Sequence, residues 1–149
     1  MPKTLGRGNL VQNKSKENEI FLAVNELQKL SNSVYRAGPL SLSTSDAATH
    51  TIWTSDAVSE GAMWSVTVYF TGHVAAGAGQ IFWVRNVAFF RQSGGGTTLV
   101  GVTDSVQVRS DGNFSVSVNV SGNAIAATVS DDLARAINWS VWIEVRVSV

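Results

Sequence analysis

The stretch Ile137-Asn-Trp-Ser-Val-Trp-Ile-Glu-Val-Arg-Val-Ser-Val149 alternates apolar and polar side chains along almost its whole length. A period of two residues is typical of a β-strand that buries one face and exposes the other. The inward face is expected to consist of Ile137, Trp139, Val141, Ile143, Val145, Val147 and Val149. This segment therefore predicts a sheet that packs on one side against a core.

The same alternation recurs elsewhere in the chain. It is clear over residues 63–70 and 114–120. Further strands are expected near residues 49–54, 97–102, 105–109 and 124–129. Turn sequences rich in Gly, Asn and Asp separate several of these segments, at residues 93–96, 111–113 and 121–123. About eight strands at roughly ten-residue spacing predict a mostly β protein, an antiparallel jelly-roll-like β-sandwich over residues 37–149.

Residues 80–91 depart from this pattern because both faces of the predicted strand are apolar. One face carries Ile81, Trp83, Val87 and Phe89, and the other carries Phe82, Val84, Ala88 and Phe90. Burial on both sides of a strand in so small a domain requires cover from an N-terminal helix or from another subunit. Phe82 and Phe90 are therefore predicted to lie in a subunit interface. Arg85 interrupts the first face and is expected to need a carboxylate or carbonyl partner.

Residues 16–36 have helical periodicity. Ser15 can cap the first turn, and Gly38-Pro39 is expected to end the helix just beyond it. The apolar positions Ile20, Val24, Leu27 and Val34 follow the heptad spacing of a coiled coil. Because so short a helix is unstable alone, it is expected to self-associate, with a parallel trimeric stalk favoured. Packing of the helix back onto its own β domain is the alternative.

Residues 1–15 are predicted to be a flexible arm. They carry Lys3, Arg7 and Lys14 but no acidic residue, and nothing in them is periodic or apolar enough to be buried. The functional interpretation is a peptide that becomes ordered when it docks on a larger assembly, with these three basic residues as anchoring contacts. The alternative is an ordinary frayed terminus.

Composition limits the chemistry that is expected. The 149 residues include 11 basic and 11 acidic side chains, so neither nucleic acid nor an anionic membrane is an expected partner. Cys is absent and only two His are present, so disulfides, metal sites and cofactors are not expected. Neither a membrane span nor a secretory signal is recognisable. Residues 37–149 carry only five Arg and eight acidic residues, which suggests surface hidden in an oligomer.

Catalysis receives little support from the sequence. A Ser–His–Asp triad can be drawn with His50 or His73 and with Asp46 or Asp104. However, no serine lies in a Gly-x-Ser-x-Gly sequence, and the serines and threonines recur at outward strand positions. Asp131-Asp132 could bind a hard cation, but a solvated loop is the favoured interpretation. The chain is therefore predicted not to be an enzyme.

Aromatic side chains on polar strand faces are the remaining binding candidates. Trp142 and Tyr69 occupy such positions. Exposed rings of this kind either stack on sugars or anchor protein contacts, and burial of Trp142 in a subunit interface is the favoured alternative. Residues 73–80 and 130–136 are expected to form loops at an exposed tip, with Arg135, Asp131 and Asp132 as their polar contacts.

A set of short segments completes the sequence evidence. They are Trp83-Val-Arg-Asn-Val-Ala-Phe-Phe-Arg91, Gly94-Gly-Gly-Thr-Thr-Leu-Val-Gly101, Val118-Asn-Val-Ser-Gly-Asn123 and Ile137-Asn-Trp-Ser-Val-Trp-Ile-Glu-Val145. Together they resemble a module of virion proteins of tailed bacteriophages, commonly the C-terminal end of fibre or spike-like proteins. The resemblance covers about residues 60–149 and departs at Asn86-Val87, where related segments often have a second Arg and an Ala. This module carries no catalytic residues.

The resemblance implies a homotrimeric protein of the virion surface, assembled in the host cytoplasm, whose β domain faces outward. One role is a short tail fibre whose arm docks on the tail or baseplate, which makes Trp142, Tyr69, His73 and Arg135 candidate contacts for a host-surface glycan. The other role is a capsid decoration protein, a cement or head fibre that binds the major capsid lattice as a trimer. The fibre role is preferred because the resemblance is to terminal modules of fibre-like proteins.

Overall fold

The computed structural model describes residues 34–149, which form eight β-strands. They are β1 (Val34–Thr44), β2 (His50–Thr54), β3 (Met63–Val74), β4 (Gln80–Arg91), β5 (Thr97–Arg109), β6 (Phe114–Ser121), β7 (Ala124–Asp131) and β8 (Ile137–Ser148). The predicted arm, the helix up to residue 33, and Lys3, Arg7, Lys14, Ile20, Val24 and Leu27 lie outside the described residues. Within residues 34–149 the mostly β fold class is confirmed.

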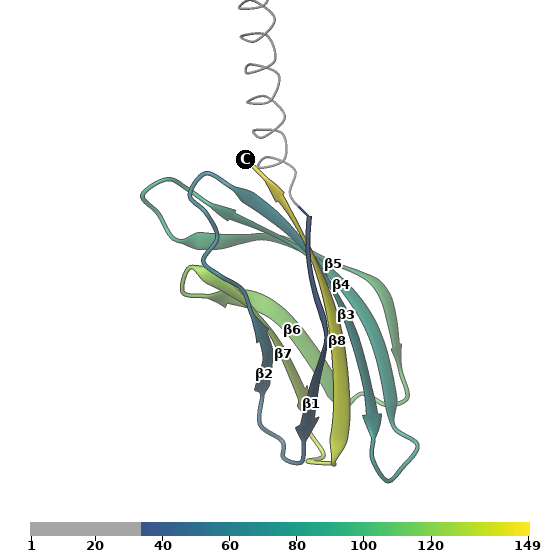
Figure 1. Cartoon of the computed structure of the whole chain (residues 1–149). Helices are drawn as coiled ribbons and strands as arrows, with labels where there is room; N and C mark the ends of the chain where they lie inside the picture. The colour runs from purple at the N-terminus through teal and green to yellow at the C-terminus, as the bar shows by residue number, and fades with distance from the viewer. Residues whose placement is uncertain (1–33) are drawn as a thin grey trace, which may run out of the picture.

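The strands form two antiparallel sheets that pack face to face (Figure 1). The larger sheet has the order β1-β8-β3-β4-β5, and the smaller sheet has the order β2-β7-β6. As in a jelly roll, the first, last and third strands are neighbours in one sheet, and the second and seventh are neighbours in the other. However, β3, β4 and β5 follow one another as hairpins within the larger sheet, which departs from the jelly-roll order.

The core lies between the two sheets. In β8, every second residue from Ile137 to Val145 is buried, as the alternation predicts. Val149 is 77% exposed, so its assignment to the inward face is wrong; β8 ends at Ser148, and the residue beyond it has no partner strand. Trp139 of β8 meets Phe114 of β6 edge to face, with 6.0 Å between ring centroids, and this contact joins the two sheets.

β1 corrects the predicted end of the N-terminal helix. Residues 34–36 pair with β8 as a strand, and Val34, which was assigned to the heptad, lies opposite Arg146 and is 54% exposed. Gly38-Pro39 lies inside β1, at a break in the register, and does not end a helix. An edge strand tolerates proline because the missing N–H can face solvent, and Gly38 supplies the φ of 122° that the break requires.

β5 corrects a second prediction. Residues 97–102 and 105–109, expected as separate strands, belong to one strand of 13 residues at the free edge of the larger sheet. The residues between them do not form a turn, because Thr103 and Asp104 pair with Asn86 and Arg85 of β4. The register of the β4–β5 pairing shifts at two places, and the strand continues through the polar residues that interrupt its apolar pattern.

β4 has one face in the core and one face outside it. Arg85, which interrupts the inner face, has both kinds of expected partner. Its Nε donates to Oδ1 of Asp104 at 2.7 Å, and its Nη1 donates to the carbonyl oxygen of Val116 at 2.7 Å. On the outer face Phe82 is 40% exposed, whereas Phe90 is half-buried. The cover that this face was expected to need is therefore incomplete within one copy.

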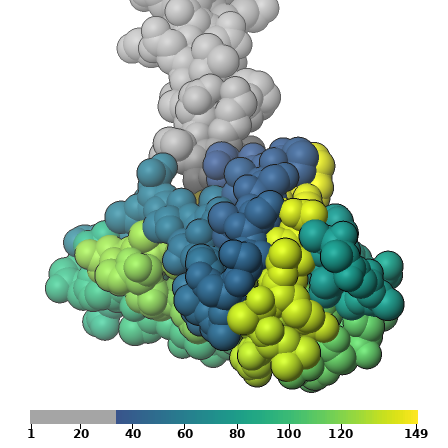
Figure 2. Space-filling model, turned by 90° about the horizontal axis from the view of Figure 1, so that it is seen from below, coloured from purple at the N-terminus to yellow at the C-terminus, as the bar shows by residue number. Residues whose placement is uncertain are grey.

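The two ends of the sandwich differ in what they carry. β1 begins and β8 ends at the same end of the domain (Figure 1). The opposite end, which we call the distal end, carries the loops at residues 45–49, 75–79, 110–113 and 132–136. Figure 2 shows the blue N-terminal part of the described chain beside yellow residues near the C-terminus, in agreement with the pairing of Thr44 of β1 with Ile137 of β8.

Gly72 is the position at which β3 makes room for the core. A Cβ atom on Gly72 would lie 2.7 Å from the ring of Trp139 and 2.9 Å from the side chain of Ile81. We expect Gly72→Ala to lower the free energy of unfolding by about 1–3 kcal/mol, because closely packed rings cannot move aside freely. Denaturant unfolding followed by tryptophan fluorescence measures the change. Gly112→Ala is the control, since a Cβ atom there meets nothing within 4 Å, and equal losses in both variants would contradict the prediction.

Candidate interaction surfaces

The outer face of the larger sheet, which points away from the smaller sheet, carries three exposed aromatic rings. Tyr69 of β3 pairs with Trp142 of β8, and Thr71, two residues further along β3, pairs with Phe82 of β4. Trp142 is 51% exposed, Phe82 is 40% exposed and Tyr69 is 39% exposed. We call these three rings the face patch. The structure thus brings together Trp142 and Tyr69, predicted as binding residues, with Phe82, predicted as an interface residue.

The face patch borders a hollow of about 460 Å³. The hollow is lined by Arg36, Tyr69, Thr71, Phe82, Trp142, Ile143 and Glu144. Glu144 accepts hydrogen bonds from Nε of Arg146 at 3.0 Å and from Nε of Arg36 at 3.1 Å. These two guanidinium groups, Arg146 more than Arg36, hold the pKa of Glu144 below its usual value. The charges at the rim are therefore paired with one another, and aromatic surface dominates the hollow.

The place of Trp142 in this patch depends on β1. A Cβ atom on Gly38 would lie 2.7 Å from the carbonyl oxygen of Val141 and 3.3 Å from the indole ring of Trp142. Glycine alone combines this close approach with a positive φ. The Gly38-Pro39 sequence therefore lets the Trp142 ring lie against the backbone of the neighbouring strand.

β5 is exposed on both of its faces. Every residue of the strand after Thr97 is exposed. The exposed fractions of its apolar residues are 44% for Leu99, 58% for Val100, 46% for Val102, 39% for Val106 and 61% for Val108. Leu99 and Val102 pair with Phe89 and Val87, whose side chains are buried between the sheets. Since Leu99 and Val102 share that inward direction and remain exposed, the larger sheet overhangs the smaller one along β5.

These five β5 residues were not predicted as interface residues. Alternation alone does not give this result, because Val100, Val102, Val106 and Val108 are two or four residues apart and would share one face of a regular strand. The two shifts of register between β4 and β5 distribute the apolar residues over both faces.

The two charged residues of β5 are held by contacts within the copy. The hydrogen bond from Arg85 keeps the pKa of Asp104 below its usual value. Nη1 of Arg109 donates to the carbonyl oxygen of Phe114 at 3.1 Å, and its guanidinium lies 5.5 Å from the ring centroid of Trp83. No Lys occurs in residues 34–149. This edge strand therefore lacks the free charges that commonly keep such edges from associating.

His73 and Arg135, predicted at an exposed tip, both lie toward the distal end but in different places. His73 is near the end of β3 on the same outer face as Tyr69, four residues away and thus about 13 Å along the strand. Its Nε2 lies 3.5 Å from Nδ2 of Asn138, and it helps to line a second hollow of about 390 Å³. Arg135 lies in the loop between β7 and β8, where its guanidinium contacts the ring of Phe114 of the smaller sheet.

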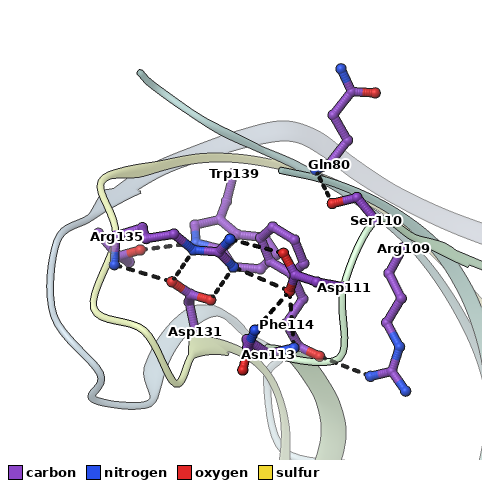
Figure 3. Close-up of polar contacts among 10 residues, drawn as sticks. Gln80, Arg109, Ser110, Asp111, Asn113, Phe114, Asp131, Arg135 and Trp139 are labelled. Atoms are coloured by element: carbon purple, nitrogen blue, oxygen red, sulfur yellow. Dashed lines mark hydrogen bonds and ion pairs between the residues drawn. The ribbon is translucent and has the colours of Figure 1, made fainter. Parts of the chain in front are cut away.

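Arg135 links two distal loops (Figure 3). Its Nη2 donates to Oδ1 of Asp131 at 2.6 Å and its Nη1 donates to Oδ2 of Asp111 at 2.8 Å, while its guanidinium lies 4.8 Å from the ring centroid of Phe114. Arg135 holds the pKa of Asp111 down to about 2 and also lowers the pKa of Asp131, whose side chain is 0% exposed. The geometry makes Arg135 a structural residue, and its predicted contact with a receptor stays a prediction.

The residues considered for catalysis and metal binding all lie within residues 34–149, so their contacts can be examined. Nε2 of His50 lies 2.5 Å from Oδ1 of Asp46, and this hydrogen bond lowers the pKa of Asp46. Within residues 34–149, no serine hydroxyl hydrogen-bonds to His50 or His73, and no group of three His, Cys, Asp or Glu side chains is arranged to hold a metal ion. Within residues 34–149, no helix is long and apolar enough to cross a membrane.

No protein-family model matches the chain, and no curated protein matches it. Among solved structures, residues of this chain are similar to the Acinetobacter baumannii phage AM24 tailspike protein, with 10% sequence identity and a TM-score of 0.37. The likeness covers 77% of this chain and 26% of that chain, so this chain spans about a quarter of the tailspike's length.

Proposed function

We propose that this protein is a non-enzymatic structural component of a bacteriophage virion surface, a short homotrimeric tail fibre that is anchored by its N-terminal arm. The observation that carries the proposal is the exposed apolar surface of β5 and of the face patch, which is suited to association between copies. The resemblance of residues 60–149 to terminal modules of phage fibre proteins supports the virion setting.

The exposed apolar surface is large for a domain of this size. It comprises the five apolar residues of β5 and the three rings of the face patch, each between 39% and 61% exposed. An aromatic side chain alone has roughly 150–250 Å² of surface, so these side chains together expose roughly 600 Å². It is divided between the two faces of the larger sheet, so each face exposes roughly 300 Å², which is the size of the largest apolar patch on many monomeric proteins and is often functional. Self-association would remove this surface from water.

The two ends of the sandwich support a direction for the fibre. Residues 1–33 precede Val34, which lies at the end opposite the distal loops. An arm that docks on the tail or baseplate through Lys3, Arg7 and Lys14 would leave the distal end facing outward. The distal loops and His73 would then be the first parts of the domain to meet a host-surface glycan.

We expect the purified full-length chain to be a trimer of 15.9 kDa subunits at micromolar concentration. Static light scattering coupled to size-exclusion chromatography measures the mass. Because the proposed contacts are apolar, raising the salt concentration should not dissociate the trimer, whereas an association held by surface charges would weaken. A monomeric mass under these conditions would contradict the proposal.

Antibody-gold labelling of intact phage particles tests the location. Label at the tail end supports the fibre, and binding of host-surface glycans by the distal end becomes the next measurement. Label spread over the head would show that the protein is a capsid decoration protein and not a tail fibre. Its loss should then lower the heat stability of the capsid. Particles without label, with an antibody that recognises the folded protein, would contradict a virion role altogether.

A further inference from the structure

Each copy carries two apolar patches on opposite sides of the larger sheet. Leu99 and Val102, with Val100 beside them, form what we call the edge patch. The first two pair with buried core residues of β4, so the edge patch faces the side of the smaller sheet, where the sheet overhangs. The face patch lies on the other side of the larger sheet. Because the sheet itself separates them, neither patch can cover the other within one copy.

We infer that the edge patch of one copy packs against the face patch of the next copy, and that three such contacts close a ring. This inference rests on the proposed trimer. A two-fold contact brings together the same surface of both copies, which would leave one of the two patches uncovered. A contact between two different surfaces repeats around a closed ring and covers both patches in every copy. A second copy is therefore the occupant that accounts for both patches.

The two surfaces are chemically suited to each other. The edge patch presents branched aliphatic side chains from a strand whose two charged residues are already paired. The face patch presents aromatic rings around a hollow of about 460 Å³ that can receive such side chains. Glu144 at the rim is paired with Arg36 and Arg146, so the contact buries no carboxylate without a partner.

The available area is sufficient for a specific contact. In a ring, each contact joins the edge patch of one copy to the outer face of the next copy, where Val106 and Val108 lie beside the face patch because Val108 pairs with Phe82. The two partners together then bury roughly 600 Å² of apolar surface per contact. Because roughly 57% of an interface is apolar, the whole contact amounts to about 1,000 Å², the size from which interfaces become specific.

The absence of Cys from the chain allows this contact to be tested by cross-linking in the full-length protein. The test variant carries Val102→Cys in the edge patch and Thr71→Cys beside Phe82 in the face patch. The matched control carries Val102→Cys and Ser115→Cys, which lies exposed on β6 in the smaller sheet. Both are treated with a short bifunctional maleimide and run on denaturing gels, after light scattering has established the mass of each untreated protein.

We expect covalent dimers and trimers to form at least fivefold more in the test variant than in the control, with nothing larger than a trimer. A trimer that cross-links no more than the control would overturn this contact and leave the proposed fibre intact, since other segments would then join the copies. If the single variant Val102→Cys cross-links as strongly as the test variant, the edge patches of two copies pair with each other. That result would also overturn the proposed contact. A monomeric mass before treatment would refute the trimer itself, so the two failures are distinguishable.

Discussion

Arg135→Met should lower the free energy of unfolding by about 3 kcal/mol at pH 7, which makes it one of the most damaging single substitutions in the domain. The reason is the side chain of Asp131, which is 0% exposed and would lose the cation 2.6 Å away. Removing one partner of a buried ion pair leaves the other charge buried without compensation. Thermal unfolding followed by circular dichroism should show a melting temperature lower by roughly 10 °C.

The pH dependence of this effect separates the loss of the ion pair from general damage. In the wild type, Arg135 lowers the pKa of Asp131 and of Asp111, the latter to about 2. A carboxyl group with a lowered folded-state pKa stabilises the fold above its unfolded pKa of about 4, and this contribution is lost as the pH falls toward the folded value. In the variant, acid instead neutralises the unpaired Asp131. The stability gap between the two proteins should therefore narrow as the pH falls from 7 to 3.

Arg146→Met is the matched control for Arg135→Met. Arg146 also pairs with a carboxylate, Glu144, at 2.9 Å, but its side chain is 70% exposed. Exposed ion pairs of this kind contribute little, so its loss should change the stability by less than about 1 kcal/mol. Equal destabilisation by both substitutions, or a gap that stays constant with pH, would show that the buried pair is not the cause.

Removal of residues 1–15 should abolish incorporation of the protein into virions while leaving its β-sheet spectrum and its trimeric mass unchanged. These residues contain Lys3, Arg7 and Lys14, no acidic residue and no segment apolar enough to enter a core. Their expected role is therefore docking on another virion protein, and not folding. Immunoblots of purified particles from a phage that encodes the shortened protein measure incorporation.

A second variant shows which property of the arm matters. The triple substitution Lys3→Gln, Arg7→Gln and Lys14→Gln keeps the length of the arm and removes its positive charge. Loss of incorporation in this variant would indicate docking on an acidic surface, whereas normal incorporation would indicate recognition of the peptide itself. If the protein that lacks residues 1–15 is present in particles at the wild-type level, the arm is not the anchor.

Local alternation predicted much of the fold. The inward residues of β8 from Ile137 to Val145 were identified from sequence, because side chains two residues apart share one face of any strand. The need of Arg85 for a partner was also predictable, since an unpaired charge is not buried in a core. Residues 34–36 were misassigned because Val34 fits a heptad and a strand equally well, and its pairing with β8 decided between them.

The sequence by itself therefore determined the sandwich class, most strand positions and the apolar character of β4, because these depend on neighbours within a few residues. Only the tertiary structure decided that β5 extends past the smaller sheet, that three rings from β3, β4 and β8 form one patch, and that Arg135 reaches Asp111, 24 residues away. The physical reason is that strand order and the overlap of two sheets arise from contacts between distant segments. The period of two residues within a strand is the same whichever strand lies beside it.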